Sequence, residues 1–250
     1  MIDYAHVTDT SPIVFALDFT SVDEAERAAA RVKSAVGMLK VGLELFVAEG
    51  PRAVKIGAAC GLPVFLDLKL HDIPETVERA VAQAAALGVR VLTVHASGGP
   101  AMLGRAVKRA ASEKSDKGEV AIAAVTVLTS LDGRDLEKMG TGKGTADDVA
   151  SHAKRLAKMA WDEGVRTFVC SAHEVASMRA ELGKGATLIT PGIRPATEGG
   201  GDDQKRVATP AKAAADGADW LVVGRPIRDA ADPLAVAVAM RDEARGARRA

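Results

Sequence analysis

The chain has 250 residues, of which 48% are apolar and 26% are charged, as in an ordinary globular protein that forms one large α/β domain or two small ones. The 33 lysines and arginines balance the 33 aspartates and glutamates. No overall electrostatic field therefore favours nucleic acid or a membrane surface, and an anionic ligand would need a local basic site.

Targeting segments and metal motifs are also missing from the sequence. Residues 1–12 lack the apolar run of a signal peptide, and no segment approaches the roughly 20 apolar residues of a membrane span. Cys60 and Cys170 lie far apart, without Cys-x-x-Cys spacing, and the five histidines have no metal-ligand spacing. We therefore expect two core thiols, a reducing cytoplasmic location, no metal site and no cofactor.

Short apolar runs alternate with alanine-rich, charged segments of helical length along the chain. The predicted strands are Ile13–Asp18, Met38–Leu43, Pro63–Lys69, Arg90–His95, Val120–Leu128, Val165–Ser171, Ala186–Pro191 and Asp219–Gly224. The predicted helices are Val22–Ala35, Leu45–Ala59, Pro74–Leu87, Ala101–Glu113, Ala146–Glu163, Glu174–Leu182, Gln204–Asp216 and Pro233–Arg245. Eight such units predict an α/β fold in which residues 1–250 form one domain, a (β/α)8 TIM barrel.

Several joints between these segments carry the expected boundary residues. Ser21 and Glu24 have the spacing of a capping box, and Pro74 stands at a predicted helix start. Glycines follow four predicted helices, at Gly61, Gly88, Gly164 and Gly217. The structural alternative, a doubly wound open sheet, is disfavoured because no Gly-x-Gly-x-x-Gly follows the first strand.

The third predicted strand carries the most informative residues. Asp67 and Lys69 alternate with apolar residues in Val64–Leu70, so in a regular strand both side chains project from the same face. Burying isolated charges is costly, and charges placed here must be paired or bound to a ligand. Asp72 follows in the loop after the strand. Two carboxylates and an ammonium at the end of an apolar strand predict an active site.

Polar residues also end most of the other predicted strands. In a barrel of this type the carboxyl ends of the strands form the active-site face. Lys40 is notable because Leu39, Val41 and Leu43 surround it with apolar neighbours. The other residues at strand ends are Asp18, His95, Thr129, Ser130 and Ser171.

The seventh and eighth strand connections have the composition of a phosphate site. Loops at these positions often hold phosphate through backbone N–H groups. The segment Pro191–Arg194 follows the seventh predicted strand, and Gly224 and Arg225 follow the eighth. Glycine allows close backbone approach, and arginine donates paired hydrogen bonds to phosphate oxygens. Gln204 could add an amide donor, so a phosphorylated small molecule is the expected ligand.

These motifs together resemble the orotidine 5′-phosphate decarboxylase family, whose members make UMP. The resemblance spans about residues 13–234. The matching segments are Phe15–Asp18, Lys40–Phe46, Asp67–Thr76, Val125–Ser130, Thr190–Arg194, Asp203–Gln204, Arg206–Pro210 and Val222–Arg225. Asp-x-Lys-x-x-Asp alone belongs to a wider superfamily, whereas its combination with Lys40 and the two phosphate loops is more specific.

The resemblance implies a role for each matching residue. Lys40, Asp67, Lys69 and Asp72 would form the family's alternating charged tetrad, with Asp72 and Thr76 given across a homodimer interface. Asp18 and Lys40 would hold the ribose hydroxyls, and Ile73, Thr129 and Ser130 would lie near the pyrimidine. The residues that match the phosphate clamp and its covering loop are Arg194, Gln204, Gly224 and Arg225. Pro191 is a further expected substrate-binding residue.

The implied reaction is decarboxylation of orotidine 5′-monophosphate to UMP and CO2, the last step of de novo UMP biosynthesis. Loss of CO2 leaves a carbanion at C6, and an ammonium beside it would stabilise the charge and supply the replacing proton. Lys69 is the expected donor. Asp67 would lie near the substrate carboxylate and disfavour it, while Lys40 and Asp72 keep Lys69 in place.

Two other functions remain as alternatives. Mg²⁺-dependent sugar-phosphate decarboxylases or synthases of the same superfamily share Asp-x-Lys-x-x-Asp but carry a metal-binding carboxylate where Lys40 stands. A barrel that binds nucleotides without catalysis is the other alternative, although clustered desolvated charges are not needed for binding. The segment Gly140–Thr145 lacks the pattern of a P-loop and is expected to be a mobile loop between the fifth strand and helix.

Overall fold

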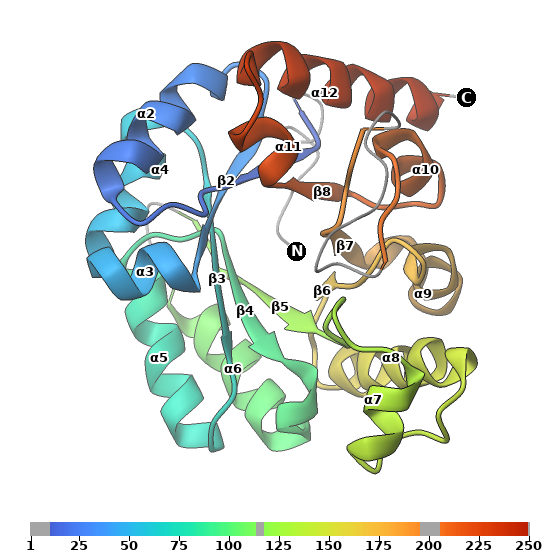
Figure 1. Ribbon diagram of the computed structural model, residues 1–250. Coiled ribbons are helices and arrows are strands. Elements are labelled where there is room, and N and C mark those ends of the chain that lie inside the picture. The colour runs from blue at the N-terminus through green and yellow to red at the C-terminus, as the bar shows by residue number, and fades with distance from the viewer. Residues whose placement is uncertain (1–10, 114–117, 196–205, 250) are drawn as a thin grey trace.

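Eight parallel strands form a closed barrel in the computed structural model, which describes residues 11–113, 118–195 and 206–249 (Figure 1). Each strand pairs with the next along the chain, and β1 pairs with β8 to close the sheet. The strands are β1 Ile13–Ala16, β2 Met38–Gly42, β3 Val64–Leu70, β4 Val91–His95, β5 Ala121–Val125, β6 Thr167–Val169, β7 Thr187–Thr190 and β8 Trp220–Val223. The predicted (β/α)8 barrel is confirmed, with most strands shorter than expected.

Helices surround the barrel, and α12 packs against both α10 and α2 where the ring closes (Figure 1). The described helices are α2 Val22–Val32, α3 Leu43–Glu49, α4 Lys55–Cys60, α5 Pro74–Ala86, α6 Pro100–Ser112, α7 Gly133–Lys138, α8 Ala146–Asp162, α9 Val175–Leu182, α10 Pro210–Ala215, α11 Arg225–Arg228 and α12 Pro233–Arg249. Three 3-10 turns add to these: η1 Gly50–Val54, η2 Ala96–Gly98 and η3 Gly183–Gly185.

Two predicted helices differ from the structure. The segment Leu45–Ala59 is broken into α3, η1 and α4, because Gly50 adopts a positive φ of 57° and the next residue, Pro51, has no backbone N–H. The prediction of a helix from Gln204 is wrong over Arg206–Thr209, since α10 begins only at Pro210 with the Thr209 side chain as its cap. Gln204 itself lies outside the described residues.

The helix boundaries predicted from capping residues are largely confirmed. The Ser21 side chain accepts a hydrogen bond from the Glu24 N–H at the start of α2, and Pro74 begins α5. The four glycines expected to end helices all have positive φ, between 69° and 105°, at Gly61, Gly88, Gly164 and Gly217. The short helices α7 and α11 were not predicted. In the Gly140–Thr145 segment, the N–H groups of Lys143 and Thr145 both donate to Asp148 at 2.8 Å.

The core has two layers, one on each side of the sheet. Inside the barrel, alternate strand residues pack together: Val14, Ala16, Met38, Phe65, Val91, Ala121, Ala123, Ile189, Trp220 and Val222. The intervening residues, such as Ile13, Phe15 and Leu39, pack outward against the helices. Because the interior is filled by side chains, only the carboxyl ends of the strands remain open for a site.

Candidate active site

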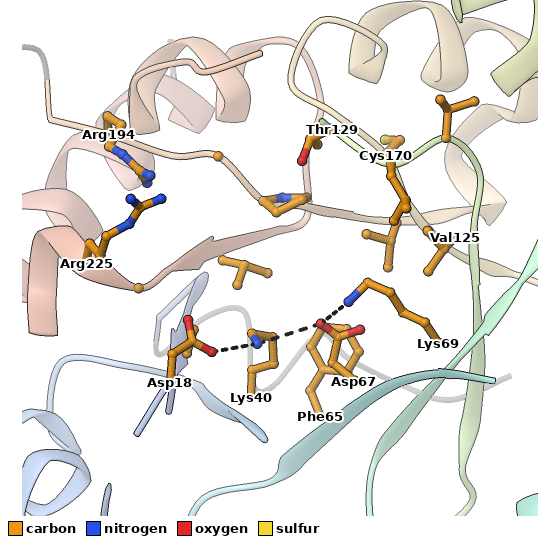
Figure 2. Close-up of a pocket in the computed structure, with 18 residues that line it drawn as sticks. Asp18, Lys40, Phe65, Asp67, Lys69, Val125, Thr129, Cys170, Arg194 and Arg225 are labelled. Carbon is orange, nitrogen blue, oxygen red and sulfur yellow. Dashed lines mark hydrogen bonds and ion pairs between the residues drawn. The ribbon is translucent and has the colours of Figure 1, made fainter. Parts of the chain in front are cut away.

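A pocket opens at the carboxyl ends of the strands (Figure 2). Nine of the residues predicted for the site line it: Asp18, Lys40, Asp67, Lys69, Thr129, Pro191, Arg194, Gly224 and Arg225. They come from six of the eight strands or from the connections that follow them, namely those of β1, β2, β3, β5, β7 and β8. Convergence on this face is what the barrel topology predicts, because parallel strands end at the same edge.

The floor of the pocket holds an alternating row of charges. The Lys40 Nζ lies 3.2 Å from Asp18 Oδ1 and 3.7 Å from Asp67 Oδ2. The Lys69 Nζ lies 2.8 Å from the same Asp67 oxygen. Figure 2 shows these contacts as one chain from Asp18 to Lys69. Lys40 and Asp67 are mostly enclosed, with 12% of each side chain exposed, so neither charge is screened well by water.

Asp67 is ionised in this setting. Burial by itself would raise the pKa of its carboxyl group, but the ammonium groups of Lys40 and Lys69 and a hydrogen bond from Thr93 lower it below its ordinary value. Two ammonium groups thus flank one buried carboxylate. Such an array is preorganised to act on charge that develops in a substrate above Lys69.

The backbone of β3 is irregular at this point, which the sequence pattern did not predict. Leu66 pairs with Leu92 of β4 and Leu70 pairs with Val94, so three residues of β3 face Thr93 alone. Within the bulge Lys69 has a φ of 49°, and it is the one residue other than glycine with positive φ in the described part of the chain. Asp67 and Lys69 do meet as expected, but through a bulge rather than through regular strand alternation.

The opposite rim of the pocket is basic. Arg194 follows β7 and Arg225 begins α11, and Figure 2 shows their guanidinium groups directed toward one another above the cavity. The backbone at Gly224 passes close to the Asp18 side chain, since a Cβ there would lie 3.2 Å from Asp18 Oδ2. The neighbouring Arg228 donates from Nη1 to the Asp18 backbone carbonyl at 3.1 Å. This rim can bind an anion at a distance from Lys69.

Some predicted residues do not line this pocket in the single chain. Asp72, Ile73 and Thr76 are exposed, and the Asp72 carboxylate accepts a hydrogen bond from the Ile73 N–H at 2.7 Å. The charged row therefore contains three of the four expected members. Ser130 is exposed beyond Thr129 and also stays outside the pocket lining.

Two other polar residues predicted at strand ends, His95 and Ser171, make contacts outside the pocket. His95 packs against His71 with ring centroids 5.4 Å apart, and burial, His71 and Lys69 lower its pKa. Ser171 is fully buried and its N–H donates to Glu174 at 3.0 Å. Neither residue lines the pocket.

The sequence analysis missed the apolar wall of the pocket. Its members are Ala16, Phe65, Val125, Val127, Leu128, Val169, Cys170 and Val222. Cys170 was expected to be a core thiol, and it is buried, with a pKa raised by burial and by Glu174, but it also faces the cavity. Alternation along the strands indicates which apolar residues face the barrel interior. It does not distinguish residues that face a cavity from residues that face the packed core.

In the part of the chain that the structure describes, the pocket lining does not contain the donor set of a metal site. No group of three or more His, Cys, Asp or Glu side chains that could hold a metal ion occurs among the described residues. The two carboxylates of the pocket floor, Asp18 and Asp67, are bridged by the Lys40 ammonium. A divalent cation at this position would be repelled by that ammonium.

Comparison with known proteins identifies the family. Residues 11–240 match the model of the "Orotidine 5'-phosphate decarboxylase / HUMPS family". The chain belongs to this family. The orotidine 5′-phosphate decarboxylase of Anaeromyxobacter sp. (strain K) is 52% identical over 228 residues, which cover 91% of this chain and 96% of that relative. The decarboxylase of Thermobifida fusca is 50% identical over 234 residues, covering 93% of this chain and 95% of that relative.

A solved structure supports the same assignment. The crystal structure of orotidine 5′-phosphate decarboxylase from Lactobacillus acidophilus superposes with a TM-score of 0.80 at 32% sequence identity, covering 94% of this chain and 99% of that one. The family resemblance and the TIM-barrel fold expected from the sequence are thereby confirmed. No helix in the described ranges is long and apolar enough to cross a membrane.

Proposed function

We propose that this protein decarboxylates orotidine 5′-monophosphate to UMP and CO2 without a cofactor. As a member of a family whose relatives are named as decarboxylases, the chain is a carboxy-lyase. The substrate assignment is based on one observation: the same pocket has a charged floor and, at a distance from it, a basic rim. The Lys40, Asp67 and Lys69 charges lie on its floor, and Arg194 and Arg225 lie on its rim.

The two parts fit the two ends of a nucleotide that carries a ring carboxylate. Arg194, Arg225 and the backbone N–H of Gly224 would bind the phosphate, and Pro191 is proposed as a further substrate contact. Asp18 and Lys40, which are hydrogen-bonded to each other, would hold the ribose hydroxyls between the ends. Thr129 and the apolar wall would contact the pyrimidine, and Ser130 is proposed to join them when substrate is bound. Gln204 is proposed to add an amide donor for the phosphate.

The chemistry follows from the charges beside the reacting carbon. Breaking the bond between C6 and the carboxylate leaves the electron pair on C6, and the Lys69 ammonium would stabilise this charge and then transfer a proton to C6. The Asp67 carboxylate beside the substrate carboxylate would raise the energy of the bound substrate more than that of the product. Phosphate binding at the remote rim would supply the energy for holding the substrate against this repulsion.

A homodimer is part of this proposal, with Asp72 and Thr76 reaching the pocket of the other subunit. Asp72, Ile73 and Thr76 are exposed in the single chain, where Ile73 has 66% of its surface accessible. Leu43 and Val47, after the neighbouring strand β2, are 51% and 81% exposed. Exposed apolar side chains that follow two neighbouring strands, β2 and β3, support an interface at this position.

The remaining parts of the assignment are also proposals. The continuous barrel from β1 to β8 supports a single domain over residues 1–250. Cys60 and Cys170 form no disulfide, which supports a cytoplasmic location. The reaction would be the last step of UMP biosynthesis, because its product is UMP itself.

The decisive experiment follows the ultraviolet absorbance of orotidine 5′-monophosphate with purified protein, with and without a chelator. We expect rapid loss of the substrate band, unchanged by chelation. Turnover that needs Mg²⁺, or that occurs only with a sugar phosphate, would favour the metal-dependent relatives instead. Tight UMP binding without any turnover would favour a non-catalytic nucleotide-binding barrel.

A further inference from the structure

Thr93 lies at the centre of β4 and is fully buried, yet its hydroxyl group contacts both charged residues of β3. The Thr93 Oγ1 donates a hydrogen bond to Asp67 Oδ1 at 3.0 Å. The same oxygen accepts a hydrogen bond from the Lys69 backbone N–H at 2.8 Å. Thr93 does not line the pocket, so any effect on the reaction must act through these two neighbours.

The hydrogen bond from the Lys69 N–H replaces backbone pairing that the bulge removes. Regular pairing between β3 and β4 is interrupted from Leu66 to Leu70, and Thr93 is the single β4 residue opposite the gap. The Lys69 N–H therefore loses a strand partner, and the Thr93 hydroxyl takes its place. This contact also holds the positive φ of Lys69, a conformation that is unfavourable for a residue with a side chain.

The contact to Asp67 selects one rotamer of the carboxylate. With Oδ1 held by Thr93, the other oxygen, Oδ2, is the one that contacts both Lys69, at 2.8 Å, and Lys40, at 3.7 Å. A single hydroxyl group therefore holds both residues of the Asp67–Lys69 pair, Asp67 through its carboxylate and Lys69 through its backbone N–H. Few side chains can do this, because one group must both donate and accept in a site closed to water.

We propose that Thr93 is a positioning residue for this active site, whose hydroxyl group keeps Asp67 and Lys69 in their reactive arrangement. This inference rests on the proposed decarboxylase function for its kinetic consequences, but its structural part stands independently. It predicts that the hydroxyl group matters and that the volume of the side chain does not. Serine should therefore replace threonine, whereas valine, which has the same shape, should not.

The hydroxyl group also affects the ionisation of Asp67. The groups that face this carboxylate are Lys40 on β2, Lys69 on its own strand, and Thr93 and His95 on β4. Burial raises the pKa of Asp67, and the lysines together with the Thr93 hydrogen bond lower it. Loss of the hydroxyl would move the pKa upward, toward the ordinary value of an aspartate. The acid limb of the pH–rate profile would then move to higher pH.

The experiment compares Thr93→Val and Thr93→Ser with the unaltered protein. For Thr93→Val we expect kcat/KM for orotidine 5′-monophosphate to fall roughly 10- to 100-fold, the loss expected for one hydrogen bond to a charged group. The loss should appear in kcat, with UMP affinity nearly unchanged. Thr93→Ser should recover most of it. Thr167→Val, a buried threonine of β6 away from the pocket, is the matched control and should keep full activity.

A second measurement does not depend on activity. The aspartate side-chain carbons are labelled with ¹³C, the Asp67 signal is assigned with Asp67→Asn, and its titration is compared in the Thr93 variants. An upward shift in Thr93→Val but not in Thr93→Ser supports the proposal. If Thr93→Val does not fold, Thr93→Ala against Thr93→Ser makes the same comparison.

The possible outcomes separate the two proposals. If the unaltered protein does not turn over the nucleotide, the proposed function fails, and the titration still decides the role of Thr93. Unchanged turnover and an unchanged Asp67 titration in Thr93→Val would overturn the positioning role. A loss in the serine variant as large as that in the valine variant would overturn it as well, because a retained hydroxyl group would then not preserve the reactive arrangement.

Discussion

Arg206 and Glu174 form an ion pair that is almost closed to solvent, with 11% and 2% of their side chains exposed. The same guanidinium donates to the Leu128 carbonyl at 2.8 Å, and the Glu174 carboxylate accepts from the Ser171 N–H at 3.0 Å. The pair thus connects the segments that follow β5, β6 and β7. Leu128 is part of the pocket wall, so this contact links the stability of the barrel to the shape of the site.

Arg206→Met should destabilise the protein strongly. It leaves the Glu174 carboxylate buried without its cation, and breaking a buried pair in this way costs about 3–5 kcal/mol. Urea unfolding measures the loss. The double variant Arg206→Met/Glu174→Leu should recover much of it, because no unpaired charge remains. Arg79→Ala, which removes an exposed pair with Glu75, is the control and should change the free energy of unfolding little. A similar small effect of Arg206→Met would contradict the interpretation.

Lys69→Ala should abolish decarboxylation and leave a folded protein. The ammonium is the proposed source of charge stabilisation and of the proton at C6, so we expect kcat to fall by more than about 1,000-fold. UMP should still bind within about tenfold of the normal Kd, a change of ~1.4 kcal/mol, because the phosphate rim is intact. Single-turnover assays and titration with UMP measure the two effects. Turnover near the normal rate would remove Lys69 from its role.

Arg225→Ala tests the phosphate rim. Loss of one charge-assisted contact should lower kcat/KM for the nucleotide about 10- to 100-fold. Turnover of the substrate nucleoside without phosphate should be the same in both proteins, since Arg225 has nothing to bind there. Lys212→Ala, on the exposed surface of α10, serves as the charge control. An unchanged kcat/KM in Arg225→Ala would show that the phosphate is bound elsewhere.

Gly42→Ala tests the packing around Lys40. The φ of Gly42 is −92°, which alanine accepts, but an added Cβ would lie 2.9 Å from Lys40 Nζ and 3.4 Å from Asp18 Oδ1. The ammonium must move, and a displacement of this size in a preorganised site lowers kcat/KM by about 10- to 100-fold. Gly246→Ala on α12, where a Cβ meets no atom within 4 Å, should leave activity unchanged. Equal activity of the two variants would be inconsistent with a fixed position for Lys40.

Asp67→Asn should destabilise the protein at neutral pH and much less in acid. The pKa of Asp67 is lowered in the folded state: burial opposes its ionisation, but Lys40, Lys69 and Thr93 together outweigh that effect. A carboxyl group with a lowered folded-state pKa contributes stability above its unfolded pKa, near 3.8, and the contribution disappears as pH falls through the folded value. Unfolding curves of both proteins from pH 7 to pH 2 measure this. A difference that does not depend on pH would contradict the assignment.

The sequence supported the fold prediction well where the pattern was local and repeated. Alternation of apolar strands with amphipathic helices predicted all eight strands, and glycines with positive φ marked the helix ends. The break of one predicted helix at Gly50 and Pro51 was also encoded locally, although the regular apolar spacing across it obscured the signal. The wrong start of α10 has a different cause. Ala208 is bridged to Ile193, and this contact between two segments is not visible in a local pattern, although Thr209 and Pro210 do have the pattern of a helix start.

The residues of the site divide in the same way. Asp18, Lys40, Asp67 and Lys69 could be predicted because they are charged residues at the ends of apolar strands. A charge buried there is costly unless it is paired or bound to a ligand. The apolar wall could not be predicted, since Cys170 or Val125 has the same sequence pattern as a core residue. Asp72 and Thr76, which the sequence also predicted for the site, are exposed and do not line the pocket of the single chain.

The sequence by itself determined the barrel, the face on which the site lies and most of the charged groups that line it. Periodicity and the cost of buried charge act along the chain and can be recognised in it. Only the tertiary structure decided how Asp67 and Lys69 meet, because the bulge in β3 and the Thr93 contacts depend on the register between two strands. Register is a relation between segments, and the hydrogen bonds that stabilise it form only when the two strands lie side by side.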